Sequence, residues 1–221
     1  MTSPATPYIA ACTTGWKQED LDRVSAIVRA GDLVVLPTDT VYGIGALADN
    51  PGAVAAVLAA KGRGRQMPPP VLVADPEDID RLCAEIPPTA YRLASAHWPG
   101  GLTVILKARP DLGWDLGETG GTLALRMPDH PIALELLART GPLAVTSANL
   151  TGAAPATDIH QAMADFGPKV AAYIDGGPTR GLTPSTILDL SRDSVRAIRL
   201  GTISLEELSA TCGQAIPDPA A

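Results

Sequence analysis

Short apolar runs alternate along this chain with segments of helical periodicity, and this alternation limits the possible folds more than any other feature. Residues 33–36 form a continuous apolar run that ends at Pro37, as in a strand buried on both faces. The preceding residues 18–30 repeat apolar side chains at helical spacing, and Gly31 ends the pattern. Strands that alternate with helices indicate an α/β fold.

The same patterns predict the remaining elements. Further strands are expected at 41–47, 71–73, 102–107, 122–126, 143–145, 171–174, 186–190 and 195–199. Further helices are expected from Asn50-Pro51 to residue 60, after Asp75-Pro76, after Pro87-Pro88, and over 131–139, 158–166 and 204–211. Strands that lie close in sequence favour a sheet of both parallel and antiparallel pairs. No linker is long enough to divide the chain.

Composition excludes several classes of protein. The net charge of −7 disfavours a broad nucleic-acid surface, which needs many phosphate-neutralising cations. Cys12, Cys83 and Cys212 lie far apart without metal-ligand spacing, so we expect reduced, buried thiols in a cytoplasmic protein. No apolar run approaches the ~20 residues of a membrane helix, and residues 1–11 lack the basic start of a signal peptide. We therefore expect no association with a membrane.

A cluster of cations stands out against this acidic background: Lys61, Arg63 and Arg65 follow the helix predicted to end near residue 60. The negative end of a helix dipole attracts one or two cations, which is the plainer explanation. Three cations on a loop spaced by glycines could also wrap a polyanion, because lysine supplies a mobile charge and arginine a planar fork. The spacing alone leaves both explanations open.

Hydroxyl and amide side chains follow several predicted strands, where α/β proteins usually place ligand contacts. The segments are 37–40, 146–149 and 184–186. Taken singly, each is better explained as a turn or a helix cap. Their recurrence beside one basic loop favours a binding pocket.

Other kinds of site are poorly supported. Gly43 and Gly45 match a dinucleotide fingerprint loosely, but Pro51 interrupts the helix that the fingerprint needs, so tight packing is the better explanation. There is no phosphate-binding GxxxxGK[ST] motif and no nucleophile motif. Three further acidic residues lack calcium-loop spacing and are expected on a solvated loop: Asp111, Asp115 and Glu118.

Taken together, the segments resemble the YrdC/TsaC family of threonylcarbamoyl-AMP synthases over residues 14–205. The resemblance rests on PTDTVYGIG (37–45), KGR (61–63), WPGGLT (98–103), LRMPDHP (125–131), SANLTG (147–152), PSTILD (184–189) and IRLG (198–201). The family signature, a KxR followed later by an SxN, is intact.

The resemblance implies a twisted mixed sheet flanked by helices, with a concave cationic cavity. The catalytic domain would span 14–211, between an N-terminal segment (1–13) and a C-terminal tail (212–221). L-threonine, bicarbonate and ATP would give threonylcarbamoyl-AMP, pyrophosphate and water. A partner complex would then transfer the threonylcarbamoyl group to tRNA, so that contact of this chain with tRNA is weak or indirect.

Roles follow where the motifs match. The resemblance implies that catalysis depends on Lys61, Arg63, Ser147 and Asn149. ATP would be bound by these residues together with Arg65, Thr122 and Arg199. Threonine and bicarbonate would be bound by Thr38, Thr40, Tyr42, Arg126 and Ser185. We expect no dedicated metal ligand, because Mg²⁺ would be held mainly by the ATP phosphates.

The chain departs from the family pattern at two positions. Met67 stands where relatives carry a further cation, which puts one phosphate contact in doubt unless Arg65 replaces it. Leu72 stands where some relatives have a histidine. The alternative hypothesis is a paralogue that binds RNA or a nucleotide without making the adenylate, and the intact KxR and SxN favour the enzyme.

Overall fold

The computed structural model describes residues 6–179 and 183–219. Within those residues, one 11-stranded sheet has the order β1-β9-β2-β3-β8-β4-β7-β6-β10-β11, and β5 pairs with β6. The strands are β1 (Tyr8–Ala11), β2 (Val34–Leu36), β3 (Gly43–Leu47), β4 (Val71–Leu72), β5 (Cys83–Ala84), β6 (Leu102–Ala108), β7 (Thr122–Arg126), β8 (Leu143–Ser147), β9 (Ala172–Asp175), β10 (Thr186–Asp189) and β11 (Arg196–Arg199). The helices are α1 (Gln18–Arg29), α2 (Pro51–Lys61), α3 (Asp78–Leu82), α4 (Pro88–His97), α5 (Pro131–Thr140), α6 (Ile159–Phe166) and α7 (Leu205–Cys212), with a 3₁₀ turn at Gly167–Lys169.

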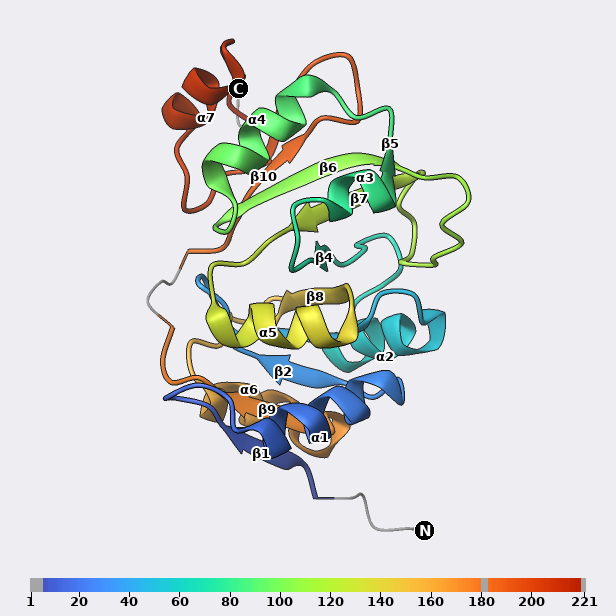
Figure 1. Ribbon diagram of the computed structural model, residues 1–221, viewed down its shortest axis with the longest axis vertical. Coiled ribbons are helices and arrows are strands. Elements are labelled where there is room, and N and C mark those ends of the chain that lie inside the picture. The colour runs from blue at the N-terminus through green and yellow to red at the C-terminus, as the bar shows by residue number, and fades with distance from the viewer. Residues whose placement is uncertain (1–5, 180–182, 220–221) are drawn as a thin grey trace.

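The sheet mixes both kinds of strand pair, which confirms the expected fold class. Strands β1 and β9, β2 and β9, β4 and β7, and β6 and β10 run parallel. The other neighbours, such as β3 and β8, run antiparallel. Figure 1 shows β1 near the N-terminal end of the molecule and β10 near the C-terminal end.

Helices cover both faces of the sheet, and this explains why β2 is apolar along its whole length. Val34 and Leu36 pack in a cluster with side chains of α1 and α5. Val35 belongs to a different cluster, with side chains of α2 and α6. Successive residues of a strand point to opposite faces, so both faces of β2 need apolar side chains.

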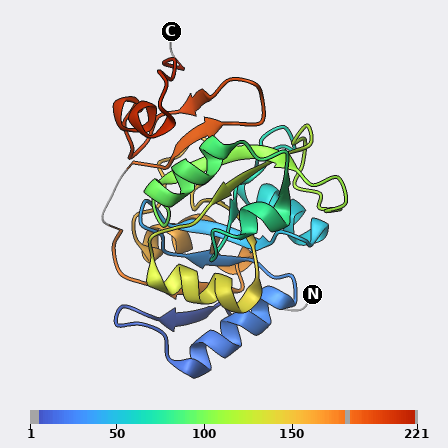
Figure 2. The ribbon, with the colours of Figure 1, turned by 45° about the horizontal axis from the view of Figure 1, so that its top comes forward.

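A third cluster fills the C-terminal end of the molecule. Side chains of α4, such as Leu93, pack with side chains of α7, such as Leu208, and with β6, β7 and β10. Figure 2 shows α4 and α7 together at that end. Within the described residues, no helix is both long and apolar enough to cross a membrane.

Strand β3 carries the two glycines of the loose dinucleotide motif, and the structure gives them a packing role. A Cβ atom added to Gly45 would lie 2.6 Å from Val145 Cγ2 and 2.9 Å from the carbonyl oxygen of Ala144. Neither position offers the turn that a dinucleotide-binding loop requires. The close packing of β3 on β8 is therefore the reason for these glycines, as expected.

Helix α2 positions the basic loop. The Asn50 side chain caps the helix by accepting a hydrogen bond from Ala53 N at 3.1 Å, and Pro51 occupies the first turn. Gly62 ends the helix in the left-handed conformation, with φ of 65°. Lys61 therefore lies in the last helical turn, whereas Arg63 and Arg65 lie on the loop that follows.

Candidate active site

A cavity of about 390 Å³ lies at the ends of several strands and is completed by the adjoining loops. Three arginines from distant parts of the sequence line it: Arg63 from the loop after α2, Arg126 from β7 and Arg199 from β11. The other predicted site residues that line it are Thr38, Thr40, Tyr42, Thr122, Ser147 and Ser185. No carboxylate is among the described residues that line the cavity.

Arg126 is fixed from three sides. Its Nη2 pairs with Asp39 Oδ1 at 2.6 Å, its Nη1 donates to Thr40 Oγ1 at 3.0 Å, and its Nε donates to the Gly100 carbonyl at 3.0 Å. The side chain is 8% exposed and that of Asp39 is 17% exposed. Burial lowers the pKa of Arg126, and Asp39 opposes that shift. The guanidinium thus has one fixed orientation in the cavity wall.

Arg63 and Arg199 are held by neutral oxygens. Arg63 Nη1 donates to Thr146 Oγ1 at 2.8 Å, and its buried Nε has no hydrogen-bond partner. Arg199 donates to the Ser185 carbonyl from Nε at 3.1 Å and from Nη2 at 2.9 Å. Desolvation lowers the pKa of Arg199, and the charges of Arg126 and Arg63 lower it further. The three cations are therefore close enough to repel one another. The hydrogen bonds of Arg63 and Arg199 go to neutral oxygens, so no carboxylate offsets this repulsion at either residue.

The hydroxyl groups of the cavity form short networks. Thr38 Oγ1 lies 3.1 Å from Thr40 Oγ1 and donates to the Val41 carbonyl at 2.6 Å. Ser185 Oγ lies 2.9 Å from Thr103 Oγ1. These contacts hold the hydroxyl groups of two loops at defined positions in the cavity wall.

Two further predicted residues are anchored by backbone carbonyls. The Tyr42 hydroxyl donates to the Gly177 carbonyl at 2.6 Å, and Thr122 Oγ1 donates to the Thr119 carbonyl at 2.8 Å. Burial raises the pKa of Tyr42 to about 12, so its hydroxyl stays protonated. The Tyr42 hydroxyl also accepts a hydrogen bond from Gly176 N at 3.2 Å, so this side chain is anchored in the wall through both its donor and its acceptor.

Lys61 and Asn149 lie behind the cavity wall and do not line it. The Lys61 ammonium, 3% exposed, donates to the Ser147 carbonyl and, at 2.6 Å, to the Asn149 carbonyl. Asn149 Nδ2 donates to the carbonyls of Leu150 and Ala153, both at 2.8 Å. Burial, followed by the charge of Arg63, lowers the pKa of Lys61 to about 8. In this structure, the KxR and SxN motifs therefore meet through the lysine and the backbone that carries Ser147.

Arg65 also lies outside the cavity. Its Nη2 pairs with Asp115 Oδ1 at 2.7 Å, and both side chains are about half exposed. Asp111 and Asp115 belong to the solvated loop that the sequence predicted, and each is paired with an arginine.

Several residues around the cavity were not singled out from the sequence. Asp39 orients Arg126, Thr146 binds Arg63, and Thr103 binds Ser185. Each lies inside or beside a motif that was recognised, so their chain positions gave a signal. What the sequence did not show is which side chains of a motif point into the cavity.

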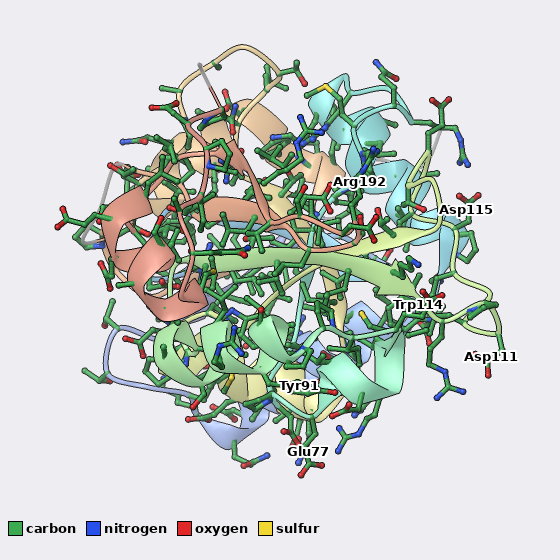
Figure 3. The ribbon with its side chains drawn as sticks, turned by 90° about the horizontal axis from the view of Figure 1, so that it is seen from above. Glu77, Tyr91, Asp111, Trp114, Asp115 and Arg192 are labelled. Carbon is green, nitrogen blue, oxygen red and sulfur yellow. The ribbon has the colours of Figure 1, made fainter. Side chains whose placement is uncertain are left out.

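A second, larger cavity of about 690 Å³ lies at the far ends of β6 and β7. It is lined by cations too, but each of them is paired with a carboxylate: Lys107 with Glu85, Arg109 with Asp111 at 2.7 Å, and Arg192 with Asp189 at 3.7 Å. Figure 3 labels Arg192 and Trp114, which line this cavity, and Asp111 at the outer edge of the molecule.

Comparison with known sequences identifies the class of protein to which this fold and the smaller cavity belong. The chain belongs to the Sua5/YciO/YrdC family, described as "Telomere recombination", which matches residues 26–201. This confirms the family expected from the motifs.

Particular relatives make the assignment more specific. A Mycobacterium tuberculosis protein is 48% identical over 192 residues, which cover 86% of this chain and 88% of the relative. The Bacillus subtilis threonylcarbamoyl-AMP synthase is 39% identical over 194 residues, which cover 86% of this chain and 56% of that enzyme. The crystal structure of Pyrococcus abyssi Sua5 complexed with L-threonine superposes with a TM-score of 0.87 at 35% identity, covering 96% of this chain and 63% of that one.

Proposed function

We propose that this protein synthesises threonylcarbamoyl-AMP from L-threonine, bicarbonate and ATP, with release of pyrophosphate and water. The observation that carries the proposal is the smaller cavity, where Arg63, Arg126 and Arg199 converge and no described lining residue is a carboxylate. Such a cavity attracts polyanions, because the three positive charges act together at close range in a partly enclosed space. The names of the curated relatives support the choice of substrates.

The chemistry needs charge neutralisation and orientation. The threonine amine and bicarbonate condense to a carbamate and release water. A carbamate oxygen then bonds to the α-phosphorus of ATP as the bond to the β-phosphate oxygen breaks, which leaves pyrophosphate. Both reactants of the second step are anions, so cations that hold them together supply much of the rate enhancement. This scheme needs no covalent nucleophile.

Arg63, Arg199 and Ser147 form the side of the cavity that we assign to the triphosphate. Arg63 lines the cavity and, within the described residues, donates only from Nη1 to Thr146, so its guanidinium keeps further N–H donors for phosphate oxygens. Lys61 acts from behind the wall, where it fixes the backbone of Ser147 and Asn149 and adds positive charge. Thr122 lines the same cavity and completes the nucleotide-binding set.

Arg126 is the natural partner for the threonine carboxylate or the carbamate. A guanidinium has five N–H donors, and its contacts with Asp39, Thr40 and Gly100 leave two of them for a ligand. Thr38, Thr40 and Ser185 contribute hydroxyl groups to the same cavity, and Tyr42 lines it while its own hydroxyl is bound to the backbone of residues 176 and 177. The fixed guanidinium and these hydroxyls can bind a small amino acid in one orientation.

We propose that Mg²⁺ enters with ATP. Within the described residues, no group of three or more histidine, cysteine, aspartate or glutamate side chains is placed to hold a metal ion. Phosphate oxygens and water are sufficient ligands for this ion. The residues of this chain then bind the phosphates themselves and orient them.

The product would be used by a transferase complex that modifies tRNA. The net charge of −7 is consistent with a weak or indirect contact between this chain and tRNA. We place the reaction in the cytoplasm, where ATP is available; three free, buried cysteines suit that reducing compartment.

The proposal is tested by incubating the protein with ATP, Mg²⁺, labelled bicarbonate and threonine. We expect pyrophosphate release that depends on threonine, together with label in a product that has the mass of threonylcarbamoyl-AMP. Serine and glycine serve as controls for the amino acid. Binding of ATP or RNA with no pyrophosphate release would instead support the paralogue that binds without catalysis.

A further inference from the structure

Two loops that are distant in sequence form neighbouring parts of the wall of the smaller cavity. The basic loop (62–70) contributes Arg63 and Met67, and the facing loop (109–121) contributes Leu116 and Thr119. Both contain positive-φ glycines, including Gly62 and Gly117. Strand β4 follows the basic loop and pairs with β7, which follows the facing loop, so the two loops end at neighbouring strands. Away from those strands, their relative position depends on contacts between the loops themselves.

Arg65 supplies those contacts with both its side chain and its backbone. Its Nη2 pairs with Asp115 Oδ1 at 2.7 Å, and its carbonyl accepts a hydrogen bond from Glu118 N at 2.8 Å. Gly117 approaches the same carbonyl so closely that an added Cβ would lie 2.6 Å from the oxygen. Asp115 Oδ1 also accepts from Gly117 N at 3.1 Å, which fixes the turn that offers the carboxylate.

The position of Arg65 distinguishes it from the cations of the site. Arg63, two residues earlier, lines the cavity, whereas Arg65 does not and its side chain is 56% exposed. The hydrogen bond from Arg65 also holds the pKa of Asp115 below its usual range. Figure 3 labels Asp115 and Asp111 on the same loop, with Asp111 farther out.

We propose that Arg65 and Asp115 form an inter-loop ion pair that holds the basic loop against the facing loop, so that Arg63 is oriented for the triphosphate. Arg65 is then a positioning residue that acts through Arg63. It does not itself bind a phosphate in place of the cation that is missing at Met67, and its effect on the triphosphate is indirect. This inference rests on the proposed function, because it assigns Arg63 to ATP.

The physical basis is the population of the binding conformation. A loop with glycines and prolines samples many conformations, and ATP binds the fraction in which Arg63 is oriented correctly. Removal of a half-exposed ion pair lowers that fraction modestly. The effect should fall on the KM for ATP, since the chemistry and the threonine side of the cavity are untouched.

The test compares Asp115→Asn, Arg65→Ala and the double variant, with Asp111→Asn as the matched control. Asp111 lies on the same loop and is also paired with an arginine, Arg109, but it does not contact the basic loop. We expect each single variant to raise the KM for ATP about two- to five-fold and the double variant to raise it no further. The kcat and the KM for threonine should stay within about twofold of wild type, as should all constants of the control.

Exchange of the charges sharpens the test. Arg65→Asp combined with Asp115→Arg should restore most of the KM for ATP, because the ion pair forms again in the opposite sense. If Arg65 bound a phosphate directly, Arg65→Ala would raise the KM while Asp115→Asn would not, and the exchanged pair would stay impaired. Either of those results would overturn the proposal.

A readout that does not involve activity separates this inference from the proposed function. The Glu118 amide, which donates to the Arg65 carbonyl, should exchange with deuterium several-fold faster in Asp115→Asn than in wild type or Asp111→Asn. Unchanged exchange would overturn the inter-loop ion pair even if the enzyme is active. Faster exchange in a protein that never makes threonylcarbamoyl-AMP would instead overturn the proposed function.

Discussion

The smaller and the larger cavity contain similar numbers of cations but differ in what surrounds those cations. In the larger one, of about 690 Å³, Lys107, Arg109 and Arg192 each pair with a carboxylate. In the smaller one, of about 390 Å³, Arg63 and Arg199 contact neutral oxygens. The volume of a cavity therefore says less about its ligand than the charge that remains uncompensated in it.

The two sets of cations differ in their exposure to solvent, and this difference has physical consequences. The pairs of the larger cavity lie at the surface, where solvent and counter-ions screen them, and such pairs contribute little. The cations of the smaller cavity are partly desolvated, and burial lowers the pKa of Arg63. A protein that accepts this cost without a carboxylate gains an anion-binding site in return.

The largest effect is expected when one arginine of each cavity is replaced and the two variants are compared. Arg63→Ala should reduce threonine-dependent pyrophosphate release about 10²- to 10³-fold, as expected for loss of one preorganised cation from the reacting phosphates. Arg109→Ala, in the larger cavity, should change the rate less than about twofold. Steady-state kinetics at saturating threonine measure both. Equal losses in the two variants would remove the distinction between the cavities.

The second comparison concerns stability. Asp39→Asn should lower the free energy of unfolding by about 2 to 3 kcal/mol, because Arg126 stays buried without its counter-ion. Glu85→Gln, which breaks an exposed pair with Lys107, should change it by less than about 0.5 kcal/mol. Urea denaturation monitors both variants. A loss of the same size at Glu85 would mean that the pairs of the larger cavity are not screened.

The third comparison uses pH. The pKa of Lys61 is lowered to about 8, so the ammonium that fixes the Ser147 backbone loses its proton above that pH. The affinity for a non-hydrolysable ATP analogue should fall about tenfold between pH 7 and pH 9. Isothermal titration calorimetry measures it. Lys107→Met should keep this dependence, whereas Lys61→Arg should move it above pH 9.

The sign of the accompanying stability change follows from the same pKa. The folded protein holds this proton less tightly than the unfolded chain, whose lysine has the ordinary pKa of 10.5. Between about pH 8 and 10.5 the unfolded state therefore binds more protons, and the contribution of Lys61 to stability rises with pH. Stability that falls in wild type relative to Lys61→Met over this window would contradict the assignment.

Much of the fold was predictable from the sequence, because the apolar patterns are regular and end at prolines and glycines. Strands β1 (YIAA) and β5 (CA) were not predicted, because their sequences lack the run of valine, leucine and isoleucine that marks the predicted strands. They form because β6 and β9 offer free backbone groups to pair with. Tyr8–Ala11 thus joins the sheet from within the predicted N-terminal segment.

The sequence motifs of the candidate site were predictable, but the direction in which each side chain points was not. The cation cluster after α2 divides three ways: Arg63 enters the cavity, Lys61 binds carbonyls behind its wall, and Arg65 pairs with Asp115. The partners of Arg65 and Lys61 are 50 and 88 residues away in sequence. No local pattern carries that information, because it depends on how β8 and the facing loop pack against the basic loop.

The most direct measurement is a crystal structure of the protein with α,β-methylene-ATP and L-threonine bound. We expect the triphosphate to lie between Arg63 and Arg199 and the threonine carboxylate to bind Arg126. Phosphates bound in the larger cavity beside Lys107 and Arg192, with no ligand on Arg63, would contradict this expectation.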